Sequence, residues 1–198
     1  MAYKYGVAVG LKNVYFAPLV TDDQGVTTYD APFKIGDTIT VKPTFEFAEG
    51  SLEADDVTIR DDAELIGITY QINTTRFAPE IEAKILGHRI DANGGIVMAD
   101  GDTPPEGALL YQKTLDNGKN KYVCVFKGVF KDFAEESQTK QRGSKNYQTP
   151  TIEYSSYRRE DGLLKYEMSE EAVNYSATAA AQWFTAVPEP VAATATPK

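Results

Sequence analysis

The sequence is poor in the residues from which most catalytic and metal sites are built. It contains one histidine, His88, and one cysteine, Cys124. Zinc needs several Cys or His ligands at close spacing, and nucleophilic triads need a histidine with its partners, so neither kind of site is expected. A single cysteine excludes an intrachain disulfide and fits a reducing compartment. We expect Cys124 to be a small buried hydrophobic residue and His88 to be a polar residue at a helix exit.

Signals for nucleotides, membranes and calcium are also missing. Neither G-x-G-x-x-G nor G-x-x-x-x-G-K-[ST] occurs. No stretch approaches the roughly 18 apolar residues that span a bilayer, and the first residues do not form a signal peptide. The segment from Asp91 resembles a calcium loop, but Ile96 occupies the position that needs glycine and Asp102 the position that needs glutamate. We therefore expect a turn-rich hairpin there, no cofactor, no metal and no membrane, and synthesis in the cytoplasm.

The charge balance excludes one further class of protein. Twenty Lys and Arg face 29 Asp and Glu, which gives a formal net charge of -9. Broad affinity for nucleic acid depends on cations that neutralise phosphates, so it is not expected. The pairs Asp55-Asp56 and Asp61-Asp62 could in principle serve glycoside hydrolysis, but adjacent residues of an extended segment point to opposite sides. A solvated or partner-facing acidic segment is the favoured interpretation.

Alternation of apolar and polar residues predicts a mainly β protein. The expected strands are 38–47, 64–74, 108–114, 121–130, 149–157 and 163–168. In 38–47 and 64–74 one face is apolar and the other rich in Thr, Gln and Asn, as in half-buried strands. Strand 121–130 is apolar on both faces, which is typical of a strand covered twice, and Asp116-Asn117-Gly118 predicts the hairpin turn before it.

One helix and three irregular segments complete the prediction. Pro79 suits a first helical turn and Gly87 a stop, so a short helix is expected to lie across a sheet. Residues 47–62 form an acidic segment that is too long for a hairpin loop, 133–146 are polar, and the end is of low complexity. We expect one β domain over 1–185, with an N-terminal arm of about 1–20 and a long loop of about 47–63, followed by a flexible tail over 186–198.

Several stretches together resemble a known family. They are Tyr5-Gly6-Val7, 11–17, Gly25-Val26, Tyr29-Asp30-Ala31-Pro32, 39–47, Ala54-Asp55-Asp56, the surroundings of Gly67, and Leu86-Gly87. As a pattern over roughly residues 1 to 165 they resemble major tail proteins of the phi13 type from long non-contractile tailed phages. Residues 166–198 have no counterpart in that pattern. This end could decorate the outside of a tube or clasp a neighbouring ring.

The resemblance implies a structural, non-enzymatic protein of the virion. Its fold would be two packed antiparallel sheets, sandwich-like or barrel-like, flanked by one short helix. Hexameric rings would stack into a tail tube, assembled in the bacterial host cytoplasm, with one sheet of each subunit lining the lumen. DNA would pass through without specific binding, because an acidic, hydrated lining keeps phosphates off the wall. Besides other copies of itself, the implied partners are tape measure, tail terminator and distal tail proteins.

Two sets of charged residues are the candidate interaction sites. The acidic segment is the expected contact between rings, and its residues are Glu49, Glu53, Asp55, Asp56, Arg60, Asp61 and Asp62. A complementary basic surface on a neighbouring subunit is expected from Lys140, Arg142, Lys145, Arg158 and Arg159. The N-terminal arm is a further candidate for such contacts.

Two other functions remain open at this point. A carbohydrate-binding or adhesion β-sandwich would share the fold class and the many tyrosines, but it would present aromatic side chains on an exposed platform. The tube component of a contractile secretion system would share the tail-tube fold.

Overall fold

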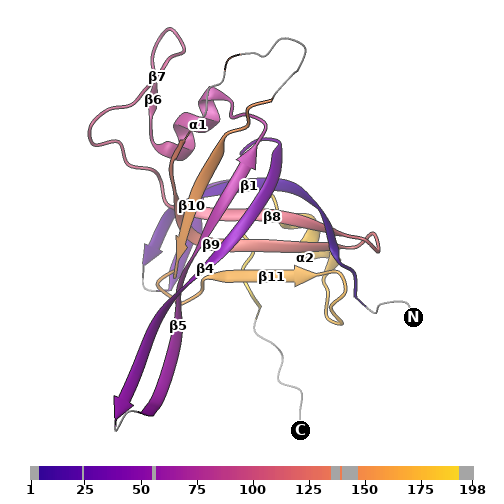
Figure 1. The fold of residues 1–198 in the computed structure, drawn as a ribbon. Coiled ribbons are helices and arrows are strands. Elements are labelled where there is room, and N and C mark those ends of the chain that lie inside the picture. The colour runs from indigo at the N-terminus through magenta and orange to yellow at the C-terminus, as the bar shows by residue number, and fades with distance from the viewer. Residues whose placement is uncertain (1–4, 24, 55–56, 135–138, 140–146, 192–198) are drawn as a thin grey trace.

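The computed structural model describes residues 5–23, 25–54, 57–134, 139 and 147–191, and only the backbone of 51–54, 57–61 and 132–134. Most of the described chain is β-strand (Figure 1). The strands are β1 (Ala8–Asp23), β2 (Val26–Tyr29), β3 (Phe33–Lys34), β4 (Thr38–Ala54), β5 (Val57–Thr74), β6 (Arg89–Ile90), β7 (Ile96–Val97), β8 (Gly107–Leu115), β9 (Asn120–Ala134), β10 (Thr151–Tyr157) and β11 (Lys165–Ser169). The helices are α1 (Pro79–Leu86) and α2 (Ala177–Gln182). All six strands expected from the sequence are therefore present.

Nine strands form one antiparallel sheet that folds over on itself. The order is β2-β1-β8-β9-β10-β5-β4, with β3 paired to β1 and β11 paired to β9, while β6 and β7 form a separate ribbon. One layer contains β1, β8, β11 and the first half of β9; the other contains the second half of β9 with β10, β5 and β4. The main core lies between them and combines Leu109 and Val123 with Tyr70 and Tyr154. The expected packing of two antiparallel layers is confirmed, and both layers belong to one continuous sheet.

A row of glycines allows the sheet to bend. Gly107 pairs with Gly128 across β8 and β9. A Cβ on Gly128 would lie 2.4 Å from the carbonyl oxygen of Ser155, and one on Gly107 would lie 2.4 Å from that of Ala17. Gly67 of β5 lies under the same constraint, 2.6 Å from the backbone of β10. Because no side chain fits along this row, neighbouring strands approach closely where the layers diverge.

Helix α1 has the expected place and ends. Pro79 occupies its first turn, and Gly87 ends it in the left-handed conformation, with φ of 75°. Its residues Ile85 and Leu86 are buried against the main core. The ribbon of β6 and β7 follows, which confirms the turn-rich hairpin expected there.

Helix α2 was not expected, and it closes the second face of the sheet. The hydroxyl of Ser176 accepts a hydrogen bond from the amide of Ala179 and caps its start. The helix brings Trp183 onto a second cluster that contains Cys124 and Phe126, whereas Val123 and Val125 face the main core. Strand β9 is thus covered on both sides over this stretch, as its sequence predicts, and Cys124 is buried as expected.

Fixed contacts continue into the segment that was expected to be a flexible tail. The indole of Trp183 is fully buried and stacks on Tyr166, with ring centroids 5.4 Å apart. Further along, the carboxylate of Glu189 accepts hydrogen bonds of 2.6 and 2.9 Å from Arg159. The contacts of Glu189 shorten the expected tail, and residues 192–198 lie outside the described part of the chain.

Two expectations about irregular segments are wrong. The expected N-terminal arm is largely strand β1, in which Val14 and Phe16 are buried in the main core. The expected loop of about 47–63 is a β-hairpin, because β4 and β5 stay paired as far as Ala54 and Val57. Figure 1 shows this hairpin projecting from the body. Its sequence lacks the apolar alternation that identifies a strand, so the pairing is not predicted there.

We predict that Trp183→Ala destabilises the protein strongly. The change opens a cavity under α2, and truncations of a buried tryptophan cost about 3–5 kcal/mol. Urea unfolding followed by far-UV circular dichroism measures the loss, since Trp183 is the only tryptophan and fluorescence disappears with it. Val173→Ala is the control, because Val173 is fully exposed. A loss below about 1 kcal/mol would mean that the C-terminal segment is not part of the core.

Candidate interaction surfaces

The described residues offer no assembled catalytic or metal site. Among them, no group of three or more His, Cys, Asp or Glu side chains could hold a metal ion. Burial raises the pKa of the Cys124 thiol well above its ordinary value, which disfavours the reactive thiolate. His88 Nδ1 lies 3.0 Å from Asp102 Oδ2. A hydrogen bond from the Ala99 amide, then His88, lowers the pKa of Asp102, so this pair braces the segment after β7.

The chain segments that the structure describes also contain no helix that is long and apolar enough to cross a membrane. The features that stand out are surfaces of the sheet, and they begin with its edges.

One layer of the sheet has an open edge on each side. Strand β4 lies at the end of the strand order and, among the strands that the structure describes, pairs with β5 alone. On the opposite side, the pairing of β8 with β9 ends at Gly107 and Gly128. From Val129 onward, β9 pairs with β10 alone among the described strands. Unpaired N–H and C=O groups at such edges readily pair with a strand of another chain.

The face of this layer that points away from the core is polar. The side chains share it in register across β9, β10, β5 and β4. They are Lys131, Thr151, Glu153, Ser155, Thr69, Gln71, Asn73, Thr40, Lys42, Thr44 and Glu46. The wet faces predicted for 38–47 and 64–74 lie here together. Lys131 Nζ is 2.6 Å from Glu153 Oε1, and Glu46 accepts a hydrogen bond from Thr69, so two of its carboxylates have local partners.

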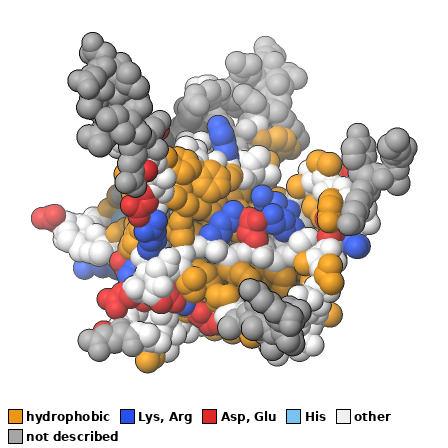
Figure 2. Space-filling model, turned by 90° about the horizontal axis from the view of Figure 1, so that it is seen from below, with side chains coloured by type: hydrophobic (Ala, Val, Ile, Leu, Met, Phe, Trp, Pro, Cys, Tyr) orange, Lys and Arg blue, Asp and Glu red, His pale blue; other side chains and the backbone are white. Residues whose placement is uncertain are grey.

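The core-facing side of β4 extends beyond the core. Phe45 and Phe47 are 48% and 52% exposed, and Ile66 of β5 is 50% exposed. The alternation predicts burial for these positions, but little of the opposite layer covers them. Figure 2 shows hydrophobic side chains gathered on one face, beside a row of basic and acidic side chains. The ammonium of Lys165 lies 5.8 Å from the Phe45 ring centroid. Apolar surface of this kind often marks an interaction site.

The structure describes part of the predicted acidic segment, on the projecting hairpin. Glu49 and Asp62 are exposed near its base. The backbone of Glu53, Arg60 and Asp61 belongs to the paired strands, while their side chains lie outside the described part. The remaining predicted residues, Asp55 and Asp56, lie between the two strands and outside the described residues.

The predicted basic surface is only partly compatible with the structure. Arg158 is exposed and donates to Glu64 Oε1 at 2.9 Å and to the carbonyl of Leu65 at 2.7 Å, at the base of the hairpin. Arg159 is buried, and its guanidinium binds Glu189 and Asp161 of the same chain. These bonds raise the pKa of Arg159, and they pair its positive charge with carboxylates of the same subunit. The prediction that Arg159 belongs to an exposed basic surface is therefore wrong.

The other basic residues, Lys140, Arg142 and Lys145, lie outside the described residues. The residues that flank them, Ala134 and Thr151, are paired with each other. Thr151 also pairs with Asn73, near the end of the layer farthest from the hairpin tip.

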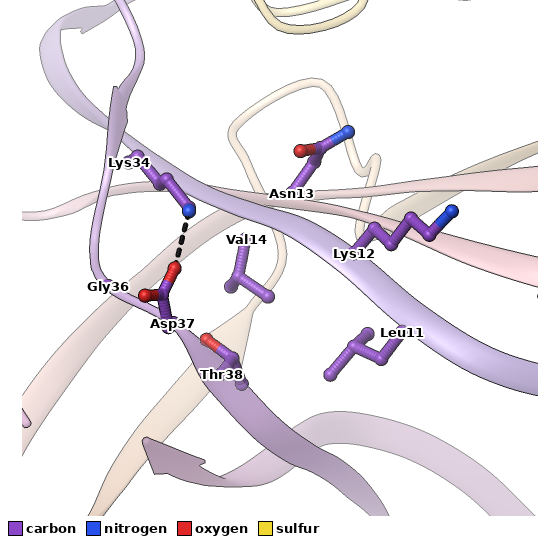
Figure 3. A pocket seen from close by; sticks show the side chains of 8 residues that line it. All are labelled: Leu11, Lys12, Asn13, Val14, Lys34, Gly36, Asp37 and Thr38. Atoms are coloured by element: carbon purple, nitrogen blue, oxygen red, sulfur yellow. Dashed lines mark hydrogen bonds and ion pairs between the residues drawn. The ribbon is translucent and has the colours of Figure 1, made fainter. Parts of the chain in front are cut away.

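That far end carries cations that the sequence did not single out. A hollow of about 240 Å³ lies there between β1 and the start of β4. Lys12 and Lys34 line it, and Lys34 Nζ is 2.6 Å from Asp37 Oδ1 (Figure 3). Arg76 lines an adjoining hollow with Lys34. The long β4–β5 ribbon thus has acidic residues toward its tip and basic residues around its other end.

Comparison with known proteins assigns the chain to a family. Residues 53–184, more than half of the chain, match the family model described as phage tail tube protein. No curated protein matches the chain. Among solved structures, it is similar to a chain of the anti-feeding prophage baseplate, determined by cryo-electron microscopy and 6-fold symmetrised. That match has 7% identity and a TM-score of 0.35, and it covers 82% of this chain and 97% of the other. On the family match, the chain belongs to the phage tail tube proteins and is a structural component of the virion tail.

Proposed function

We propose that this protein closes into hexameric rings that stack as the tube of a long non-contractile tail of the phi13 type, through which DNA is ejected. The observation that carries the proposal is the layer of β9, β10, β5 and β4, which has two open edges and a polar outer face. Its role is mechanical rather than catalytic. Tape measure, tail terminator and distal tail proteins are the expected partners, and assembly takes place in the host cytoplasm.

Ring closure follows from joining the two open edges. The edge of β4 in one subunit would pair with β9, from Val129 onward, in the next subunit. Such a contact is heterologous, and repeated around an axis it closes without leaving a free edge. The polar faces of all subunits then form one continuous surface, which would line the lumen.

This lining suits a conduit that must not hold DNA. Cations bind phosphates, but here Lys131 is neutralised by Glu153. Hydroxyl and amide groups make up most of the remaining face, and they hold water against the wall. On this face Lys131 and Lys42 are matched in number by Glu153 and Glu46. This balance of charge, rather than a strongly acidic wall, supports the passage of DNA without specific binding.

Stacking follows from the two ends of the β4–β5 ribbon. The acidic hairpin of one ring would contact the basic end of the next ring, around Lys12 and Arg76; Lys34 already pairs with Asp37. The segment with Lys140, Arg142 and Lys145 joins the sheet near that same end, so it is available as part of the same partner surface. Opposite charges on opposite ends favour a head-to-tail order.

Shortening the hairpin tests the contact between rings. We predict that replacing Gly50–Asp62 with an Asn-Gly turn, which joins the paired residues Glu49 and Ala63, leaves a folded protein that forms no tubes. The described strand residues that are removed pair with each other across β4 and β5, and none of them belongs to the main core. Negative-stain electron microscopy shows assembly, and circular dichroism shows the fold. Isolated rings would support the proposal, and tubes of normal length would contradict it.

A second variant tests the contact within a ring. We predict that Phe45→Lys prevents rings as well as tubes, because a lysine beside the open edge of β4 disfavours pairing with another strand. Phe45 is 48% exposed and its ring lies 5.8 Å from the Lys165 ammonium, so we expect the free energy of unfolding to fall by only about 1–2 kcal/mol, which leaves the protein folded. Val173→Lys is the matched control at a fully exposed position. Analytical ultracentrifugation measures ring formation, and unchanged sedimentation of Phe45→Lys relative to the control would overturn the assignment of this edge.

A further inference from the structure

The ribbon of β6 and β7 carries apolar side chains that remain exposed to solvent in the single subunit. Ile90 is 41% exposed, and Met98, directly after β7, is 65% exposed. Asp91 accepts hydrogen bonds from the amides of Asn93 and Gly95, at 2.9 and 2.7 Å, and holds the turn. The exposed apolar side chains are thus carried on a segment with a defined shape.

A hollow of complementary character opens between β1 and β4. It has a volume of about 320 Å³, and its apolar lining comes from Val9, Leu11, Ile39 and Val41. Val9 is 66% exposed and Ile39 is 49% exposed, so the hollow opens to solvent. Lys113 stands in its lining.

The charges of the two features are opposite. The β6–β7 segment carries Asp91 and Asp100 beside its apolar side chains, against one exposed cation, Arg89. Burial lowers the pKa of Lys113 in the hollow, and Lys165 and Lys121 lower it further against the opposing effect of Glu167. A carboxylate brought to this rim would therefore stabilise the charged form of Lys113.

The two features also lie on opposite sides of the subunit. In Figure 1 the β6–β7 ribbon projects on one side, beside α1, and the start of β1 lies on the other. Helix α1, which precedes β6, contacts β9, whose second half has one of the open edges. The hollow borders β4, which has the other open edge. Joining the two edges brings the ribbon of one copy toward the hollow of the next.

We propose that the β6–β7 ribbon of each subunit docks into the β1–β4 hollow of its neighbour in the ring, with Met98 entering between Val9 and Ile39. The partner is a second copy of this chain, and the inference rests on the proposed ring. Methionine suits this role, because its flexible thioether adapts to irregular apolar gaps. Docking would cover apolar surface on both subunits and place acidic side chains beside Lys113.

Disulfide cross-linking tests this contact. We expect the double variant Met98→Cys/Val9→Cys, oxidised after assembly, to give a ladder of covalent oligomers up to the hexamer on non-reducing gels. A disulfide needs Cβ atoms about 3.5–4.5 Å apart, so the ladder reports close contact. Both positions are exposed, and the native Cys124 is buried. The matched control is Met98→Cys/Val173→Cys, whose second cysteine is exposed but lies outside the hollow.

The outcomes separate this inference from the proposed function. A ladder in the Val9 variant that is absent from the control supports the docking. Rings or tubes seen by electron microscopy without a ladder overturn the docking and leave the ring intact. The absence of rings and tubes in the unmodified protein would overturn both the proposed function and the docking that depends on it.

Discussion

The fold depends on strand β9, which belongs to both layers of the sheet. Its first half pairs with β8 and β11, and its second half pairs with β10. The change of partner occurs at Gly128, where a Cβ would lie 2.4 Å from the Ser155 carbonyl oxygen. The layers can pack on each other only because the strand bends there without a side chain. The same departure from β8 leaves the second half of β9 with an open edge, so the core and the assembly surface have one cause.

The folded subunit still exposes apolar side chains and unpaired backbone groups. Beyond the core, Phe45, Phe47 and Ile66 are about half exposed, and fuller burial of each would contribute roughly 1 kcal/mol. Unpaired backbone groups along β4 add a directional requirement, since only another strand satisfies them in register. A monomeric protein would be expected to shield so long an edge. In the proposed ring, that edge would supply specificity, and the apolar side chains would supply much of the affinity.

The sequence predicts the body of the fold better than its extremities. The alternation in 38–47 and 64–74 reports a sheet with one buried face, and these strands are present. Between them β4 and β5 remain paired as far as Ala54 and Val57, but the sequence there shows no alternation of apolar and polar residues, so the hairpin was not predicted. Helix α2 was missed because its alanine-rich sequence has no amphipathic pattern, and its large anchor, Trp183, follows it. The sequence does not reveal that Arg159 is buried, because its partner, Glu189, lies 30 residues away in a stretch of low complexity.

The distribution of charge has a consequence for the direction of a stacked tube. Residues 47–63 contain six acidic residues and one cation, while Lys12 and Arg76 lie near the other end of the same ribbon. If two rings met by their hairpin ends, many like charges would face each other across the joint, and the repulsion would oppose assembly. Head-to-tail contact replaces that repulsion by attraction in each joint. In the proposed tube, the acidic hairpins would therefore act less as a general repellent for DNA than as a means of giving the tube one direction.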